Sequence, residues 1–277
     1  MDLEAFLQTL AQYYAQYFTP YVTADYEGDA FQHFGLPHLT AIGITALILL
    51  FIVFTRNKLE DEDRAGIREV MGQILLINQI GYYIWLYTNQ NLPPLNLIPR
   101  IPLKIIPITL IGILVWLSIF MLFKKRQTLY ETVYLIGTIP ALYALIIPAE
   151  SPYGFPHFLF FFTLIPPAII FLASIYMSVA ETEMEIRLIS ILRALVVANL
   201  IAAIVYGINL YLGTNFLNLL NKPKTSPFPL PDAPLHLLYY EGIAIVSSLI
   251  LYLPFLIKDM IRRRNLNADT ERIKDFI

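Results

Sequence analysis

The sequence predicts an all-α membrane protein built as a bundle of seven transmembrane helices. Of its 277 residues, 57% are hydrophobic and only 14% are charged. A soluble domain is about 45–50% apolar and about 25% charged. The apolar residues also gather in stretches that reach the length of about 20 residues needed to cross a bilayer as a helix. The net charge of −2 indicates no nucleic-acid partner, and membrane lipids are the partners we expect.

The residue types exclude several kinds of site. The chain has no cysteine, so it can form no disulfide, no thiolate metal site and no cysteine nucleophile. Its histidines show neither an HExxH motif nor an HxxxH pair. No serine lies in a G-x-S-x-G turn, and the glycines form no phosphate-binding loop. We therefore expect no metal and no cofactor.

The first element expected is an amphipathic helix over residues 3–18, within an N-terminal segment of residues 1–30. The apolar side chains that recur at helical spacing there are Leu3, Phe6, Leu7, Leu10, Tyr14 and Tyr17. Such a helix either lies on the membrane interface or packs its apolar face on the bundle. The opening sequence MDLEAF lacks the basic region of a cleavable signal peptide, so we expect it to be retained.

Seven apolar stretches follow within a transmembrane domain of residues 31–258. They are residues 38–55, 68–88, 101–123, 128–148, 157–180, 188–212 and 234–257. Lysine and arginine are enriched in the cytoplasmic flanks of membrane helices. Fifteen of the 19 basic residues lie in the flanks at 56–68, 124–126, 187–193 and 258–274. The N-terminus is therefore predicted outside, with residues 259–277 as a basic cytoplasmic tail.

This orientation places all four histidines at the outer end of the bundle: His33, His38, His157 and His236. Three interpretations are open, namely interfacial decoration, a metal site without any recognisable pairing, and a pocket that opens outwards. The connection at residues 213–241 would cover that end, because it is rich in proline and asparagine and leads straight into a carboxylate, Glu241.

Glu241 lies about two helical turns inside the last stretch, where an ionised carboxylate costs about 2.5–3.5 kcal/mol or more. One hypothesis pairs it with Lys104, the basic residue at comparable depth in the third stretch. In the alternative, the Lys104 side chain extends to the interface and Glu241 stays neutral, with a hydrogen bond to asparagine or tyrosine.

Four segments in order resemble the bacterial YwaF-like integral membrane proteins, over about residues 31–257. The segments are FQHFGLPHLTA (31–41), IPLKIIP (101–107), YGFPHFLFFF (153–162) and NLYLGTNFLNLLNKP (209–223). The resemblance implies a multi-pass bundle in the bacterial cytoplasmic membrane. A related animal branch is described as transferring acyl chains onto lyso-ether-phospholipids through a cysteine and a nearby histidine. Here those two positions hold Ile106 and Lys104, so thiolate chemistry cannot be carried over.

The sequence predicts a pocket that binds a lipid or another amphiphile, in a protein that could also be an accessory subunit of an envelope complex with a membrane-protein partner. The residues expected to line it are His38, Lys104, His157, Asn215, Lys222, His236 and Glu241. A second hypothesis is a lipid acyl or headgroup transferase that uses His38 or His157 as general base. A third is a proton-coupled transporter in which Glu241 titrates.

Overall fold

The computed structural model describes residues 3–18, 28–89, 108–181, 183–223 and 229–275. Every regular element among them is a helix, which confirms the predicted all-α class. Five helical segments are long and apolar enough to cross a membrane. They are α2 (Leu36–Thr55), the segment Gln127–Ile146, α7 (Phe158–Val179), α8 (Leu188–Leu212) and the stretch His236–Arg264 of α9 (His236–Asp275).

Two of the seven expected spans are not among the helices that are long and apolar enough to cross a membrane. The second expected span falls in α3 (Asp61–Asn89), whose first turn holds Asp61, Glu62 and Asp63. The third falls partly outside the described residues, and its described part is α4 (Leu110–Lys124), a shorter apolar helix. The chain is thus a membrane protein with several apolar helices, while the count of seven and the orientation stay predictions.

The chain divides into two compact units. Unit 1 comprises residues 1–125 and 137–182, and unit 2 comprises residues 126–136 and 183–277. Unit 1 holds α1 (Leu3–Tyr17), α2, α3, α4, α6 (Thr138–Ile146) and α7. Unit 2 holds α5 (Gln127–Thr132), most of the π-helix η3 (Val133–Gly137), α8, the short 3₁₀ helix η4 (Phe216–Asn218) and α9.

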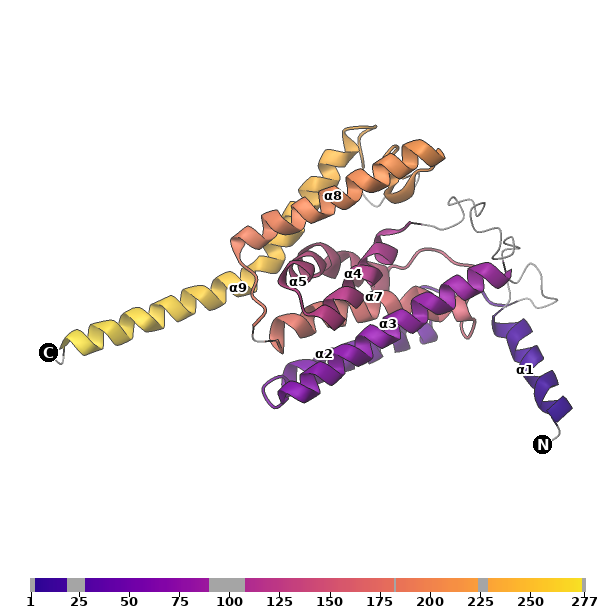
Figure 1. Ribbon diagram of the computed structural model, residues 1–277, viewed down its shortest axis with the longest axis horizontal. Coiled ribbons are helices and arrows are strands. Elements are labelled where there is room, and N and C mark those ends of the chain that lie inside the picture. Colours follow the sequence, from indigo (N-terminus) through magenta and orange to yellow (C-terminus); the bar gives the residue numbers. More distant parts are fainter. Residues whose placement is uncertain (1–2, 19–27, 90–107, 182, 224–228, 276–277) are drawn as a thin grey trace. The chain divides into compact units, whose positions relative to one another are not determined.

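Helix α7 forms the centre of unit 1. It contacts α2, α3, α4 and α6, and Figure 1 labels three of these neighbours, α2, α3 and α4. Its inward side chains Ile170, Ala173, Tyr176 and Met177 are fully buried. A helix that is apolar all round needs neighbours or lipid on every side, and α7 has helical neighbours on several sides.

A buried carboxylate joins three helix ends in unit 1. Glu181, just after α7, is 3% exposed and pairs with Arg68 of α3 and with Lys125 (Nζ to Oε2, 2.7 Å) at the end of α4. The hydroxyl of Tyr176 donates to the main-chain oxygen of Arg64, at 3.1 Å. These contacts hold the ends of α3, α4 and α7 at a common level.

The expected N-terminal helix forms as α1, with its apolar side chains exposed. It is attached to unit 1 through Phe18, whose carbonyl accepts a hydrogen bond from Trp85 Nε1 at 2.6 Å and whose ring lies 4.9 Å from that of Phe158. Its location at a membrane interface stays a prediction.

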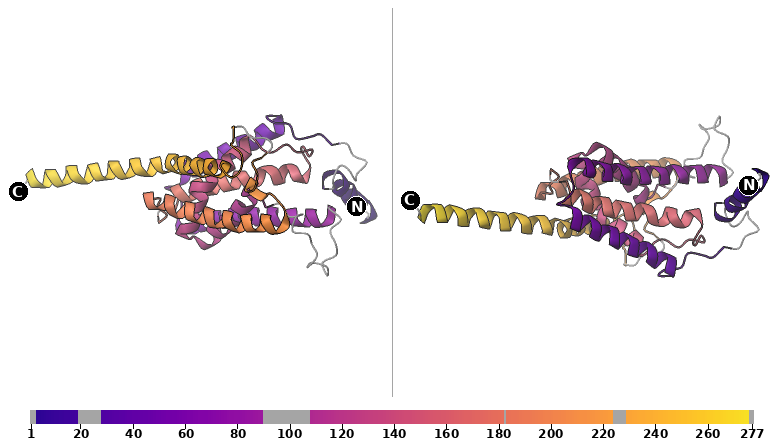
Figure 2. Two further views of the ribbon diagram at one scale, coloured as in Figure 1. Left: turned by 90° about the horizontal axis from the view of Figure 1, so that it is seen from above. Right: turned by 90° about the horizontal axis from the view of Figure 1, so that it is seen from below.

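In unit 2, α8 contacts α5, α9 and η4. The connection after α8 turns back along that helix, so that α9 begins beside the second half of α8 and not at its end (Figure 2, left). This reversal decides which side chains of α8 and α9 meet.

Candidate functional site

The reversal after α8 is built around one asparagine. Gly213 takes the left-handed conformation (φ 64°) that ends the helix, and Asn209 is fully buried one turn before it. The Asn209 Oδ1 accepts hydrogen bonds from Phe216 N (2.8 Å) and Thr214 Oγ1 (2.9 Å), and its Nδ2 donates to Phe216 O (2.9 Å). Irregular backbone at membrane depth is tolerated only when such groups are satisfied inside the protein, and Asn209 satisfies them here.

Three residues predicted to line the pocket form the rest of this connection. Asn215 binds the main chain of Leu220 and Asn221, His236 Nε2 lies 2.9 Å from Asn218 O, and Lys222 Nζ lies 2.8 Å from Asp232 Oδ1. The hydrogen bond from the Lys222 ammonium lowers the pKa of the Asp232 carboxyl. The described partners of Asn215, Lys222 and His236 thus all belong to the connection, and their role toward a ligand stays a prediction.

Glu241 meets α8 at the middle of that helix. Asn199 Nδ2 donates to both carboxylate oxygens, at 3.1 and 3.2 Å. Asn199 lies 13 residues before the end of α8, which corresponds to about 20 Å of helix. A membrane-spanning α8 therefore places this contact near the bilayer centre, where a carboxylate is most costly.

The two side chains lie in an apolar groove between α8 and α9. Its lining consists of Leu192, Leu195, Val196, Asn199, Leu200 and Glu241, around a volume of about 360 Å³. The groove is open to the surface, and its lining has the composition of small-molecule sites, with mostly apolar walls and a few polar groups. The groove belongs entirely to unit 2.

His38 and His157 belong to unit 1, and both are fully buried. His38 Nδ1 accepts the main-chain N–H of Phe34 at 3.0 Å, and Nε2 lies 2.9 Å from Leu145 O. The ring is therefore the Nε2–H tautomer with both nitrogens engaged. His157 Nδ1 likewise accepts from Leu159 N (3.1 Å) as the cap of α7.

These contacts describe structural histidines. A general base needs a ring nitrogen that can receive the substrate proton, and the Nδ1 of each ring is already occupied by a main-chain N–H. The transferase hypothesis requires such a contact to open first, and the catalytic role of His38 and His157 stays a prediction.

Replacing His38 by alanine should lower the free energy of unfolding by about 1–3 kcal/mol or more, because the buried carbonyl of Leu145 loses its partner. The partly buried N–H of Phe34 loses its acceptor as well. The control is His33→Ala, since that residue is exposed and its described hydrogen-bond partner is one carbonyl, Pro148 O, at 2.9 Å, beside ring contacts with Phe31 and His38. Thermal unfolding in detergent measures both. Equal losses for the two variants would contradict this account of His38.

The predicted pocket combines residues of both units with Lys104, which lies outside the described residues. The Lys104–Glu241 ion pair therefore stays a prediction. The contact that the structure does show for Glu241 is the hydrogen bond from Asn199.

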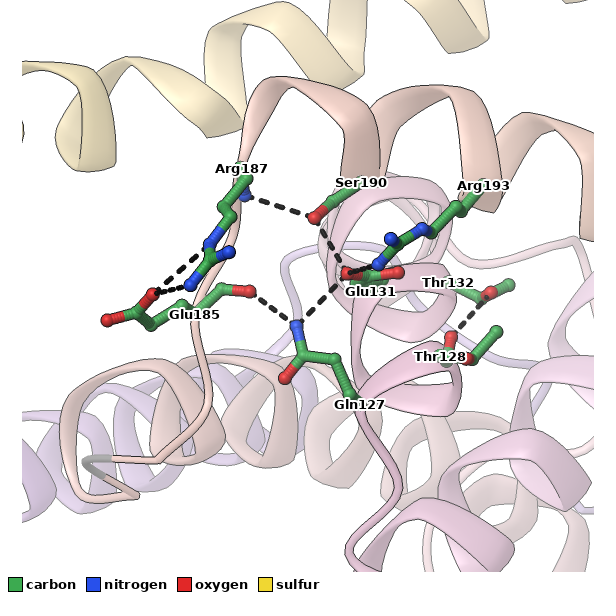
Figure 3. A network of polar contacts seen from close by, with 8 residues as sticks. All are labelled: Gln127, Thr128, Glu131, Thr132, Glu185, Arg187, Ser190 and Arg193. Carbon is green, nitrogen blue, oxygen red and sulfur yellow. Dashed lines mark hydrogen bonds and ion pairs between the residues drawn. The ribbon is translucent and has the colours of Figure 1, made fainter.

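Sequence reasoning missed a buried carboxylate of unit 2, Glu131. It lies in α5, is 2% exposed, and its Oε1 accepts from Ser190 Oγ (2.7 Å), Gln127 Nε2 (3.1 Å) and Arg193 NH1 (3.4 Å). Figure 3 shows Glu131 facing Ser190 and Arg193 of α8. The depth argument used for Glu241 does not find it, because Glu131 is the fourth residue of the expected span of residues 128–148, about one turn from its basic flank.

The hydrogen bonds around Glu131 extend to the segment before α8. The π-helix η3 follows α5 directly in the chain. Gln127 Nε2 also donates to Glu185 O, and Arg187 N donates to Ser190 Oγ at 3.0 Å. Within η3, Leu135 O accepts from Ser248 Oγ of α9, at 3.4 Å. π-Helical turns occur often at functional positions, and Glu131 lies two residues before this one. The surroundings of Glu131 are therefore the second candidate site in unit 2.

Comparison with known proteins corrects the resemblance drawn from the sequence. The family model that matches is that of the TMEM164 family, a transmembrane family, over residues 31–252. A search of curated proteins and a search of solved structures each found no match.

The resemblance to YwaF-like bacterial proteins is therefore wrong. It depended on four short apolar segments interrupted by proline and histidine, a composition that many membrane helices share. The family match covers nearly the same part of the chain and well over half of its length. The chain belongs to the TMEM164 family.

Proposed function

We propose that this membrane protein binds a single-chain amphiphile in the groove between α8 and α9. The observation that carries the proposal is the carboxylate–amide pair of Glu241 and Asn199 within apolar walls, at the middle of a span. Leucine and valine side chains of α8 would contact the hydrocarbon chain. The polar pair would orient the head group, as the few polar groups of apolar binding sites do.

A photoreactive single-chain amphiphile, with its diazirine in the hydrocarbon chain, tests this on the full-length protein in lipid nanodiscs. After irradiation, peptide mapping should place the adduct on residues 192–200 of α8 and around Glu241. Val196→Trp should remove most of this labelling, because the exposed Val196 side chain lines the groove and an indole would fill it.

The matched control is Leu210→Trp, which introduces the same indole at an exposed position of α8 outside the groove. It should leave the labelling unchanged. Adducts spread evenly over the lipid-facing helices, or equal labelling of the Val196→Trp and Leu210→Trp variants, would rule out a specific groove site.

The other expectations from the sequence stay predictions. They are the outward pocket shared by His38, Lys104 and His157, the accessory role in an envelope complex, the transferase, the proton-coupled transporter and the bacterial cytoplasmic membrane. Two of the sequence predictions enter the proposal: the ligand is an amphiphile, and Glu241 is its polar contact. The proposed site uses residues of unit 2 alone.

A further inference from the structure

We propose that the α8–α9 groove selects amphiphiles whose head group is a primary ammonium. The inference rests on the proposed function, because it names the ligand class of the same groove. Two independent properties of the polar pair lead to it: which hydrogen-bonding positions remain open, and which charge has no counter-ion among the described residues.

The first property is that the open positions are all acceptors. Asn199 Nδ2 carries two hydrogens. One bonds to Leu195 O at 3.0 Å and the other is shared by the two oxygens of Glu241. What remains is Asn199 Oδ1 and the other lone pairs of the carboxylate. A ligand head group must therefore supply donors, and an ammonium supplies three.

The second property is the charge of Glu241. Its described polar partner is a neutral amide, although a carboxylate at the bilayer centre is normally paired. Three cations of unit 2 are engaged elsewhere: Arg193 with Glu131, Arg187 with Glu185, and Lys222 with Asp232. A bound ammonium would supply the missing positive charge, whereas a carboxylate or phosphate head group would be repelled.

Four probes that share the same length of hydrocarbon chain separate the effect of hydrogen-bond donors in the head group from the effect of its charge. Dodecylamine, protonated at neutral pH, has both; dodecanol has one donor and no charge; dodecyltrimethylammonium has the charge and no donor; dodecanoate has the opposite charge. Each competes with the photoreactive amphiphile for the groove of the full-length protein in nanodiscs, and the concentration that halves the labelling is measured.

Dodecylamine should compete at the lowest concentration and dodecanoate at the highest. A hydrogen bond to a charged group contributes about 1.5–3 kcal/mol, so the preference for dodecylamine over dodecanol should be about tenfold or more. Glu241→Gln should remove most of that preference, since it keeps the shape and one acceptor but loses the charge. Asn199→Ala, at an exposed position, should reduce it less.

The outcomes separate the two proposals. If none of the four probes competes for the groove, the proposed function itself fails. If all four compete equally, or if Glu241→Gln leaves the ranking unchanged in a protein that melts like the wild type, the groove binds amphiphiles but the ammonium selectivity is overturned. It is also overturned if the preference appears only in Lys104→Ala, because Lys104 would then be the counter-ion of Glu241.

Discussion

Replacing Asn209 by alanine should lower the free energy of unfolding by at least about 3 kcal/mol, because three groups lose a partner at about 1–3 kcal/mol each. The groups are the main-chain N–H and C=O of Phe216 and the hydroxyl of Thr214. All three lie where the chain reverses along α8, against the fully buried side chain of Asn209. Thermal unfolding in detergent, scored by loss of helical circular dichroism, measures the change.

Asn221→Ala is the matched control for this prediction. Asn221 belongs to the same connection, but its side chain is exposed and the described hydrogen bonds are made by its main chain. Its replacement should change the stability by no more than about 0.5 kcal/mol, as at other surface positions. Asn209→Asp adds a second test, because it keeps the acceptor for Phe216 N but loses the donor to Phe216 O.

The Asn209 variant also bears on the groove. Asn209 sets where the chain reverses, and the reversal brings Glu241 beside Asn199. A folded Asn209→Ala protein should therefore lose part of its amphiphile labelling although Asn209 does not line the groove. If Asn209→Ala and Asn221→Ala melt at the same temperature, the role assigned to Asn209 is wrong.

Replacing Glu131 by alanine should cost about 2–4 kcal/mol of stability, from the lost hydrogen bonds to a charged acceptor and from the cavity left behind. Ser190 loses the acceptor of its buried hydroxyl, and Gln127 keeps only Glu185 O. Arg193 is 55% exposed and can turn to solvent, which limits the loss. Unfolding in detergent at several temperatures gives the change in free energy.

Glu185→Ala is the control, because this glutamate belongs to the same network but is 57% exposed. The Arg187 guanidinium hydrogen-bonded to it lowers the pKa of the Glu185 carboxyl, yet exposed ion pairs contribute only about 0–1 kcal/mol. Glu131→Gln keeps an oxygen for Ser190 and should fall between the two. A Glu131→Ala protein as stable as Glu185→Ala would show that the network contributes little.

Much of the fold could be predicted from the sequence because hydropathy is a local property. The apolar stretches at residues 38–55, 157–180 and 188–212 correspond closely to α2, α7 and α8. A run of about 20 apolar residues needs no information about its neighbours to form a helix in a bilayer, since all its main-chain hydrogen bonds are internal. The same reasoning was weaker for α3, whose first turns are acidic.

The partners of the polar residues could not be predicted in this way, because a hydrogen bond joins positions far apart in the chain. The sequence shows that Glu241 is costly, but only the reversal built on Asn209 decides that it meets Asn199. It shows His38 at the end of a span, but only the tertiary structure places Leu145 O, in the last turn of α6, against its ring.

By itself, the sequence determined that this protein is an all-α membrane protein with several apolar spans and a costly carboxylate in the last one. Only the tertiary structure decided the hydrogen-bond partner of that carboxylate, the apolar side chains around it and the burial of Glu131. The physical reason is the range of the forces involved. Burial of apolar surface acts on any stretch that is apolar enough, whereas a hydrogen bond forms only when two specific atoms come within about 3 Å.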